Sequence, residues 1–104
     1  MIIDDSMWHD GVLERVAIDA RPKGRELEIA VMLYPEPINA KDRKKYQIIV
    51  SGLIDFTVEG NLEEIIDNAN AGNINSGAIS DSELSIEFFC GSISARDNIS
   101  ANEL

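Results

Sequence analysis

The chain has 104 residues, 44% of them hydrophobic, a size at which one domain with one core forms. We expect residues 1–104 to fold as a single domain. A single cysteine excludes an internal disulfide, and the N-terminal residues lack the basic stretch and apolar run of a secretory signal. No apolar run approaches the roughly 18 residues of a membrane span, so the composition predicts a soluble cytoplasmic protein without membrane contact.

The net charge of −10 is placed unevenly along the chain. Residues 1–52 hold nine acidic and eight basic residues, net −1, whereas residues 53–104 hold ten acidic residues and one basic residue, Arg96, net −9. Such an acidic surface repels nucleic acid and attracts basic proteins. An acidic surface also keeps a protein soluble, and this simpler explanation accounts for the same charge.

Two strands joined by a charged turn are predicted in the first third of the chain. Residues 12–20 and residues 26–34 both alternate between apolar and polar side chains, and Leu27 and Ile29 lie on the apolar face of the second strand. Residues 21–25 contain a glycine and connect the two strands as a hairpin.

A cluster of four cations precedes the next strand, at Lys41, Arg43, Lys44 and Lys45. Such a cluster suggests a nucleic-acid surface. Nucleic-acid surfaces interleave aromatic side chains with their cations, however, and no aromatic residue is interleaved here. Because the whole chain is also strongly acidic, the cluster predicts a solvated loop and no nucleic-acid partner.

Residues 46–59 form the element around which we expect the rest of the chain to be organised. Apolar residues at even positions share one face of an extended chain. They are Tyr46, Ile48, Val50, Ile54, Phe56 and Val58. Gly52 interrupts the pattern, which is typical of a bulge or bend. The stretch therefore predicts a half-buried strand that curls, with Val50 and Phe56 in the core.

After this strand the apolar period changes from two to about 3.6 residues. An amphipathic stripe is formed by Leu62, Ile65, Ile66 and Ala69. Asn61 is placed to cap the start of a helix, Glu64 completes a capping box, and Gly72 is placed to end the helix. We expect one short helix packed on the sheet.

One clear strand and one weak strand are predicted after the helix. Residues 83–90 alternate, and Ile86, Phe88 and Cys90 share the apolar face. Residues 74–79 are rich in small and polar side chains and predict at most a short strand.

Two arrangements are open for the chain around Gly91. A turn at Cys90 and Gly91 pairs Phe88 with Ile93 and keeps apolar residues on one face, whereas the alternative is one long strand bent at Gly91.

The chain end is expected to be only partly ordered. Ile99 belongs to a last short strand, and residues 100–104 are expected to be loose. The elements together predict an α+β fold, with a single curved, mostly antiparallel sheet of five or six strands and one short helix packed on it.

Catalysis requires convergent groups, and few are available. His9, Asp10 and Cys90 include a thiol and a base, but Cys90 alternates with inward apolar residues and is expected to be an unreactive core residue. One histidine and one cysteine cannot furnish a structural zinc site, and the sequence has no calcium loop or glycine-rich phosphate loop. We therefore expect no enzyme activity, no cofactor and no metal.

The segment Trp8-His9-Asp10 supports two interpretations. In the structural one, Trp8 closes an open end of the core, His9 bonds to nearby backbone and Asp10 starts a turn. In the functional one, the three residues form a recognition patch or the site of a small enzyme or ligand-binding domain.

Three stretches carry a resemblance: Trp8-His9-Asp10-Gly11 followed by a strand, SGLIDF in the central strand, and LSIEFFCGSISA in the late hairpin. They resemble small bacterial β-rich proteins that are immunity proteins of polymorphic or contact-dependent toxin systems. The resemblance implies a protein that caps the active site of a toxin and has no catalytic residues.

We therefore expect an acidic protein-binding module, an immunity protein that neutralises a cognate basic toxin of nuclease type. Nucleases present cationic grooves for phosphate, which an acidic cap can occupy. The alternatives are a small enzyme or ligand-binding domain and an oligomer-forming module with a paired sheet edge, and the oligomeric state stays open. The predicted partner-binding residues are Asp55, Glu59, Glu63, Glu64, Asp67, Asp81, Glu83 and Glu87.

Overall fold

The computed structural model describes residues 2–36, 42–68 and 71–104, and it describes residues 53 and 54 by their backbone. The positions predicted for Lys41, Ala69 and the Ile54 side chain lie outside this described set.

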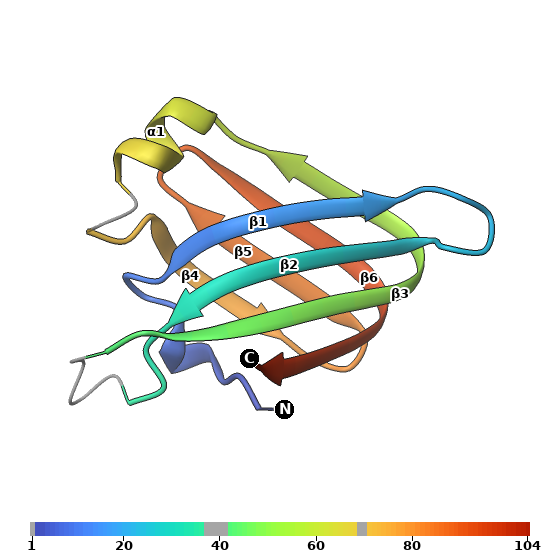
Figure 1. The fold of residues 1–104 in the computed structure, drawn as a ribbon, viewed down its shortest axis with the longest axis horizontal. Coiled ribbons are helices and arrows are strands. Elements are labelled where there is room, and N and C mark those ends of the chain that lie inside the picture. The colour runs from blue at the N-terminus through green and yellow to red at the C-terminus, as the bar shows by residue number, and fades with distance from the viewer. Residues whose placement is uncertain (1, 37–41, 69–70) are drawn as a thin grey trace.

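Six strands and two short helices make up the described chain. In order they are the 3-10 helix η1 (Asp5–Met7), β1 (Val12–Asp19), β2 (Glu26–Leu33), β3 (Lys44–Glu59), α1 (Leu62–Asp67), β4 (Ile74–Ile79), β5 (Glu83–Phe88) and β6 (Gly91–Glu103). The strands form one antiparallel sheet in the order β1-β2-β3-β6-β5-β4 (Figure 1). The prediction of a curved antiparallel sheet with one short α-helix is thereby confirmed.

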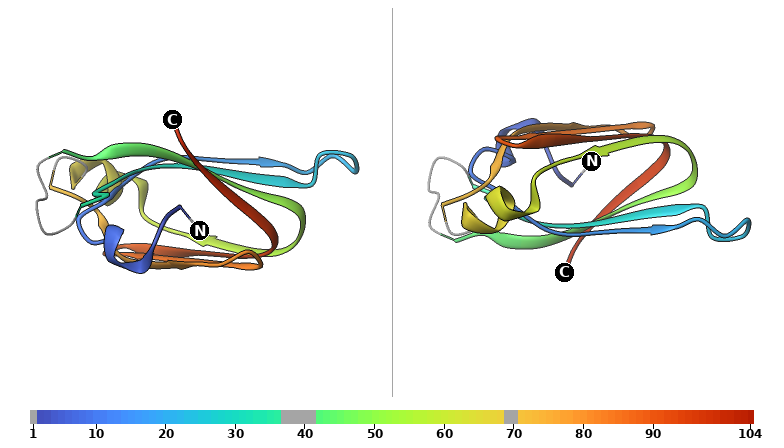
Figure 2. Two further views of the ribbon diagram at one scale, coloured as in Figure 1. Left: turned by 90° about the horizontal axis from the view of Figure 1, so that it is seen from below. Right: turned by 90° about the horizontal axis from the view of Figure 1, so that it is seen from above.

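The sheet curls into two layers because β3 and β6 both pass from one layer to the other (Figure 2). The front layer holds β1, β2, residues 44–51 of β3 and residues 98–103 of β6. The back layer holds β4, β5, residues 55–59 of β3 and residues 92–96 of β6. Apolar side chains between the two layers form the core.

Both long strands bend at the same place. The pairing of β3 with β6 shifts between Ser51 and Asp55, and two residues in this region, Gly52 and Asp97, have positive φ angles of 66° and 125°. A Cβ atom added to Gly52 would lie 3.1 Å from the Asp97 carboxylate, so the two bends touch. The bend predicted at Gly52 is confirmed, and glycine suits it because it adopts positive φ without steric cost.

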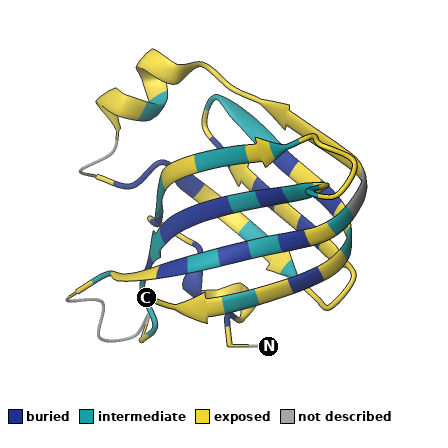
Figure 3. Ribbon diagram, turned by 45° about the vertical axis from the view of Figure 1, so that its right-hand side comes forward, coloured by how far each residue is buried: buried dark blue, intermediate teal, exposed yellow. Residues whose placement is uncertain are grey.

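The buried residues are those of the inner faces, and buried and exposed residues alternate along the strands (Figure 3). Five of the six predicted core residues are buried: Leu27, Ile29, Val50, Ile86 and Phe88.

The prediction that Phe56 lies in the core is wrong, because its side chain is 43% exposed, as is that of Val58. Both side chains do face inward, since they pair across the strands with buried Ala95 and Ile93. The pairing of β2 with β3 ends at Ser51, so β2 does not continue over this part of the back layer. An alternating pattern identifies a face, but it does not show whether a second layer covers that face.

Helix α1 covers less of the sheet than its apolar stripe predicts. The Asn61 side chain caps the helix by accepting a hydrogen bond of 3.2 Å from the backbone N–H of Glu64. Ile65 packs against the core, but Leu62 and Ile66 are 69% and 63% exposed. The helix lies at one end of the two layers rather than across the sheet (Figure 1). No helix in the described ranges is long and apolar enough to cross a membrane.

The hairpin between β5 and β6 turns one residue earlier than predicted. Phe88 pairs with Gly91, so Phe89 and Cys90 form the turn and the predicted pairing is wrong. A Cβ atom on Gly91 would lie 2.0 Å from the carbonyl oxygen of Glu59. Gly91 is therefore required by the close approach of β3 and begins β6.

The prediction that Cys90 is an inward strand residue is also wrong. Cys90 is half-buried at the turn, where it packs against the edge of the core. Its thiol donates a hydrogen bond of 3.6 Å to the carbonyl oxygen of Asn61, which links the turn to the start of α1.

The end of the chain is ordered as part of the sheet, which contradicts the prediction of a loose end. Strand β6 continues to Glu103, where it pairs with Tyr46 of β3. Ile99 is buried and pairs with Val50, and this apolar contact helps to explain why the strand continues.

Candidate functional site

The segment around Trp8 makes structural contacts. Trp8 is fully buried, and a Cβ atom added to Gly77 of β4 would lie 2.3 Å from its indole ring. The Nδ1 atom of His9 lies 3.3 Å from the carbonyl oxygen of Asn75, and Asp10 has a positive φ of 63°. These contacts fit the structural interpretation of the three residues.

His9 and Asp10 contact each other, with 3.6 Å between Nε2 and Oδ2, but no described contact joins either of them to Cys90. His9 also contacts the backbone of Asn75 in β4, whereas Cys90 bonds to the backbone of Asn61. Within residues 2–36, 42–68 and 71–104, no group of three or more His, Cys, Asp or Glu side chains is positioned to hold a metal ion.

The described cations of the predicted loop contact the protein itself. Arg43 stacks over the ring of Tyr34, with 5.1 Å between the guanidinium carbon and the ring centroid. Lys44 and Lys45 each form an ion pair of 3.5 Å with a glutamate. Each of these three cations therefore has a partner within the chain.

The outer surface of the back layer, which we call the acidic face, brings together four of the predicted partner-binding residues. In the register of the sheet, Arg96 of β6 lies between Asp55 of β3 and Glu83 of β5. Ser92 of β6 lies in the same way between Glu59 and Glu87. A row of small hydroxyl side chains lies between these two acidic rows. The acidic face comprises Asp55, Thr57, Glu59, Glu83, Ser85, Glu87, Ser92, Ser94 and Arg96.

Negative charge on the acidic face is only partly compensated. The Nη2 atom of Arg96 lies 2.7 Å from Oδ2 of Asp55, and both side chains are mostly exposed. Glu59, Glu83 and Glu87 form no ion pair within the described part of the chain. Four carboxylates and one guanidinium give this face a formal charge of −3.

The middle of the acidic face carries small polar side chains. Thr57, Ser94 and Ser85 lie side by side across three strands and are exposed. They contribute to the lining of a hollow of about 490 Å³, which also includes residues of the inner face such as Phe56 and Leu84 and Asp5 of η1. Hydroxyl groups both donate and accept hydrogen bonds, so this row can bind polar groups of a partner without first moving large side chains.

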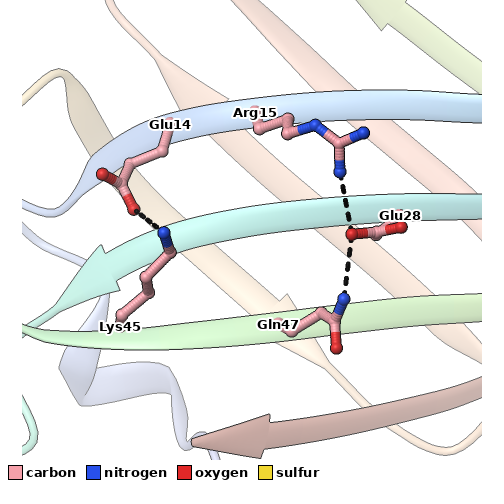
Figure 4. Close-up of polar contacts among 5 residues, drawn as sticks. All are labelled: Glu14, Arg15, Glu28, Lys45 and Gln47. Atoms are coloured by element: carbon pink, nitrogen blue, oxygen red, sulfur yellow. Dashed lines mark hydrogen bonds and ion pairs between the residues drawn. The ribbon is translucent and has the colours of Figure 1, made fainter. Parts of the chain in front are cut away.

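The outer surface of the front layer is different, because four of its charged residues, Glu14, Arg15, Glu28 and Lys45, are paired with one another (Figure 4). Oε1 of Glu28 accepts hydrogen bonds of 2.9 Å from both Arg15 and Gln47. Lys45 lies 3.5 Å from Glu14. Glu26 on this surface forms no ion pair within the described chain, but most of the unpaired carboxylates on the two outer surfaces lie on the acidic face.

The remaining predicted residues lie at the two ends of the acidic face. Glu63, Glu64 and Asp67 are exposed on α1, which follows the Glu59 end of β3. Asp81 lies in the turn between β4 and β5, near the other end. The structure thus places four of the eight predicted residues together on the acidic face, three on α1 and one in the turn between β4 and β5.

Sequence analysis missed Arg96 and the hydroxyl row as parts of this surface. Their outward position depends on the pairing of β6 with both β3 and β5. Alternation around the buried Ile93 and Ala95 would have placed Ser92, Ser94 and Arg96 on the opposite face.

No family model, curated protein or solved structure in the comparisons matches this chain. The functional argument therefore rests on the surface that the chain itself presents.

Proposed function

We propose that this protein is an acidic binding module that neutralises a basic partner protein, and that it acts as an immunity protein against a nuclease-type toxin. The observation that carries this proposal is the acidic face, where three glutamates without ion pairs surround a row of small hydroxyl groups.

The contrast between the two outer surfaces supports binding rather than solubility alone. A protein that needs charge only for solubility gains nothing from concentrating it on one side. Here the front layer pairs Glu14, Arg15, Glu28 and Lys45 internally, while the back layer leaves three glutamates without an ion pair in the described chain. A one-sided field of this kind steers a partner of opposite charge toward a particular surface.

A nuclease is the partner class that this surface fits best. Nucleases bind the phosphate backbone through clustered lysine and arginine side chains. Carboxylates on a flat strand surface can pair with those cations and block access to them. The resemblance of residues 8–11, 51–56 and 84–95 to bacterial immunity proteins supports a toxin as the partner, and the nuclease class follows from the charge of the acidic face.

The test is co-expression with the product of the adjacent upstream gene in a bacterial host. The wild-type protein is expected to co-purify with that product and to restore growth when the product is toxic. A variant carrying Glu59→Lys, Glu83→Lys and Glu87→Lys is expected to lose both effects while it keeps the circular dichroism spectrum of the wild type.

A matched control separates position from total charge. Glu26→Lys, Glu36→Lys and Asp42→Lys change the net charge by the same amount but lie outside the acidic face. This control is expected to retain binding and protection. Equal loss in both variants would mean that net charge alone matters, and retention in both would remove the acidic face as the interface.

A further inference from the structure

One side of the back layer ends in an unpaired strand edge. β3 pairs with β2 only up to Ser51, and beyond the bend residues 55–59 pair with β6 alone. No backbone hydrogen bond joins their other side to another segment of the described chain. This stretch, which we call the β3 edge, runs along the upper border in Figure 1 toward α1.

The β3 edge lacks three of the features that protect free edges, namely bulges, prolines and lysines. Its protection is limited to its short length and to the carboxylates of Asp55 and Glu59, which do not repel a basic strand. Strand β1 has a register shift between Leu13 and Arg15, and β4 has one between Ile74 and Ser76. Residues 55–59, with the sequence DFTVE, contain no proline, no lysine and no register shift.

The front-layer part of β6 offers a useful comparison, because it is also paired on one side only. There the inward Ile99 is buried, and its N–H donates a hydrogen bond of 3.0 Å to the carbonyl oxygen of Asp81. At the β3 edge, by contrast, the inward Phe56 and Val58 are nearly half exposed. Of these two strand segments, the β3 edge is therefore the one whose inward side chains are exposed.

A groove of about 390 Å³ lies beside the β3 edge. Val58 and Leu62 line it on one side, and Leu13 and Val16 of β1 line it on the other. Apolar side chains of an added strand would point into this groove and cover Val58.

The charges at the β3 edge select the kind of strand that can be added. Its outward residues are Asp55, Thr57 and Glu59. Two copies of the edge, paired antiparallel about Thr57, would place Asp55 of each opposite Glu59 of the other, and parallel pairing would also oppose like charges. Like charges directly opposite one another destabilise a strand pair, whereas opposite charges stabilise it.

We propose that the β3 edge is the docking site for an extended segment of a basic partner, which adds as one more strand to the back layer. Its alternate apolar side chains enter the groove, and its alternate lysine or arginine side chains pair with Glu59 and with Asp55, which shares its carboxylate with Arg96. This inference rests on the proposed function, because it assumes a basic partner, and it adds where and in which conformation a part of that partner binds.

The test uses the full chain labelled with ¹⁵N and the peptide Lys-Val-Lys-Val-Lys-Val-Lys. Binding is expected to slow amide exchange at alternate residues of the β3 edge, whose N–H groups point away from β6. Two further peptides carry N-methyl groups, either on every lysine or on every valine. Alternate N–H groups of a strand face the same edge, so one methylation pattern is expected to weaken binding by about tenfold or more and the other to weaken it much less.

Two variants of the chain add a second measurement. Val58→Lys places an inward charge at the edge and is expected to weaken binding by at least about tenfold. The double variant Asp55→Lys with Glu59→Lys is expected to reverse the charge preference of the edge, so that the peptide Glu-Val-Glu-Val-Glu-Val-Glu binds in place of the lysine peptide.

Three results would overturn the inference. In the first, both methylated peptides bind equally well, and the chain variant with Glu83→Lys and Glu87→Lys no longer binds the peptide. This result would show that the peptide binds to the acidic face, and it would leave the proposed function intact. Failure of the lysine peptide to bind would exclude the β3 edge, while the co-expression test decides the proposed function independently. Protection of residues 55–59 that rises with protein concentration alone would show that the edge pairs with a second copy.

Discussion

Phe88 and Phe89 are adjacent phenylalanines with opposite environments. Phe88 ends β5 and is 6% exposed in the core, whereas Phe89 begins the turn and is 70% exposed. Because the two residues are adjacent in the sequence, substituting each in turn tests whether Phe88 lies on the buried inner face of the back layer.

Phe88→Ala is expected to lower the free energy of unfolding by about 3–5 kcal/mol, because it removes a large buried side chain and leaves a cavity. Phe89→Ala is expected to change it by less than about 1 kcal/mol, since little buried surface is lost. Urea denaturation of both variants provides the measurement. Similar shifts of the two midpoints would contradict the burial described for β5.

Asp19, at the end of β1, has a carboxyl pKa well below its usual value. The Nε and Nη2 atoms of Arg21 donate hydrogen bonds of 3.0 and 2.7 Å to its carboxylate, and the backbone N–H of Arg21 donates a third of 3.1 Å. These bonds lower the pKa of Asp19 from 3.8 to about 2.

The direction of the resulting pH dependence follows from this lowered pKa. Because the pKa of Asp19 is lower in the folded chain than the unfolded value of 3.8, the folded chain binds fewer protons at this group. The stabilisation of the folded state by the Asp19 carboxylate is therefore present above pH 3.8 and is lost as the pH falls through about 2. Titration of the Asp19 carboxyl carbon by NMR is expected to give a midpoint near 2, and Arg21→Gln is expected to move it upward. A wild-type midpoint near 3.8 would show that the pair does not persist in solution.

At the scale of elements, alternation predicted most of the strands but not what covers them. The apolar face of residues 26–34 and the bend at Gly52 follow from local sequence, because side chains alternate in a strand and glycine permits positive φ. The exposure of Phe56 and the order of residues 100–104 depend on which strand lies opposite, and this information is not local. The acidic residues of the candidate site were predictable from charge, whereas their common face required the register of β6.

Asn73 shows how a single side chain can join several elements. It is buried, and its Oδ1 accepts a hydrogen bond of 3.0 Å from the backbone N–H of Leu13 in β1. Its Nδ2 donates a hydrogen bond of 2.9 Å to the carbonyl oxygen of Ile65 in α1. Asn73 thus joins β1 and α1 through hydrogen bonds to their backbones.

Asn73→Ala is expected to destabilise the protein by about 1–3 kcal/mol, because it leaves partly buried backbone groups unpaired. Hydrogen exchange is expected to accelerate most in α1 and at Leu13. Asn75→Ala serves as the control, since Asn75 is exposed and its described contact to His9 uses only backbone. Equal effects at the two positions would argue against Asn73 as the link between these elements.

At the scale of the whole molecule, the bend of β3 and β6 separates two kinds of surface. The front layer carries paired charges, and the back layer carries the acidic face with the β3 edge along its border. The excess of acid in residues 53–104 becomes a one-sided field because most of the back-layer strands come from that part of the chain. A partner of opposite charge is therefore expected to approach from one side.

The most direct measurement of this account is the rate of association with the co-purified partner at low and physiological salt. The wild-type rate is expected to fall as salt screens the acidic face. The variant with Glu59→Lys, Glu83→Lys and Glu87→Lys is expected to associate about tenfold or more slowly at low salt and to lose most of the salt dependence. The control variant with Glu26→Lys, Glu36→Lys and Asp42→Lys is expected to stay closer to the wild type. An unchanged rate and an unchanged salt dependence in the first variant would contradict the claim that the acidic face receives a basic partner.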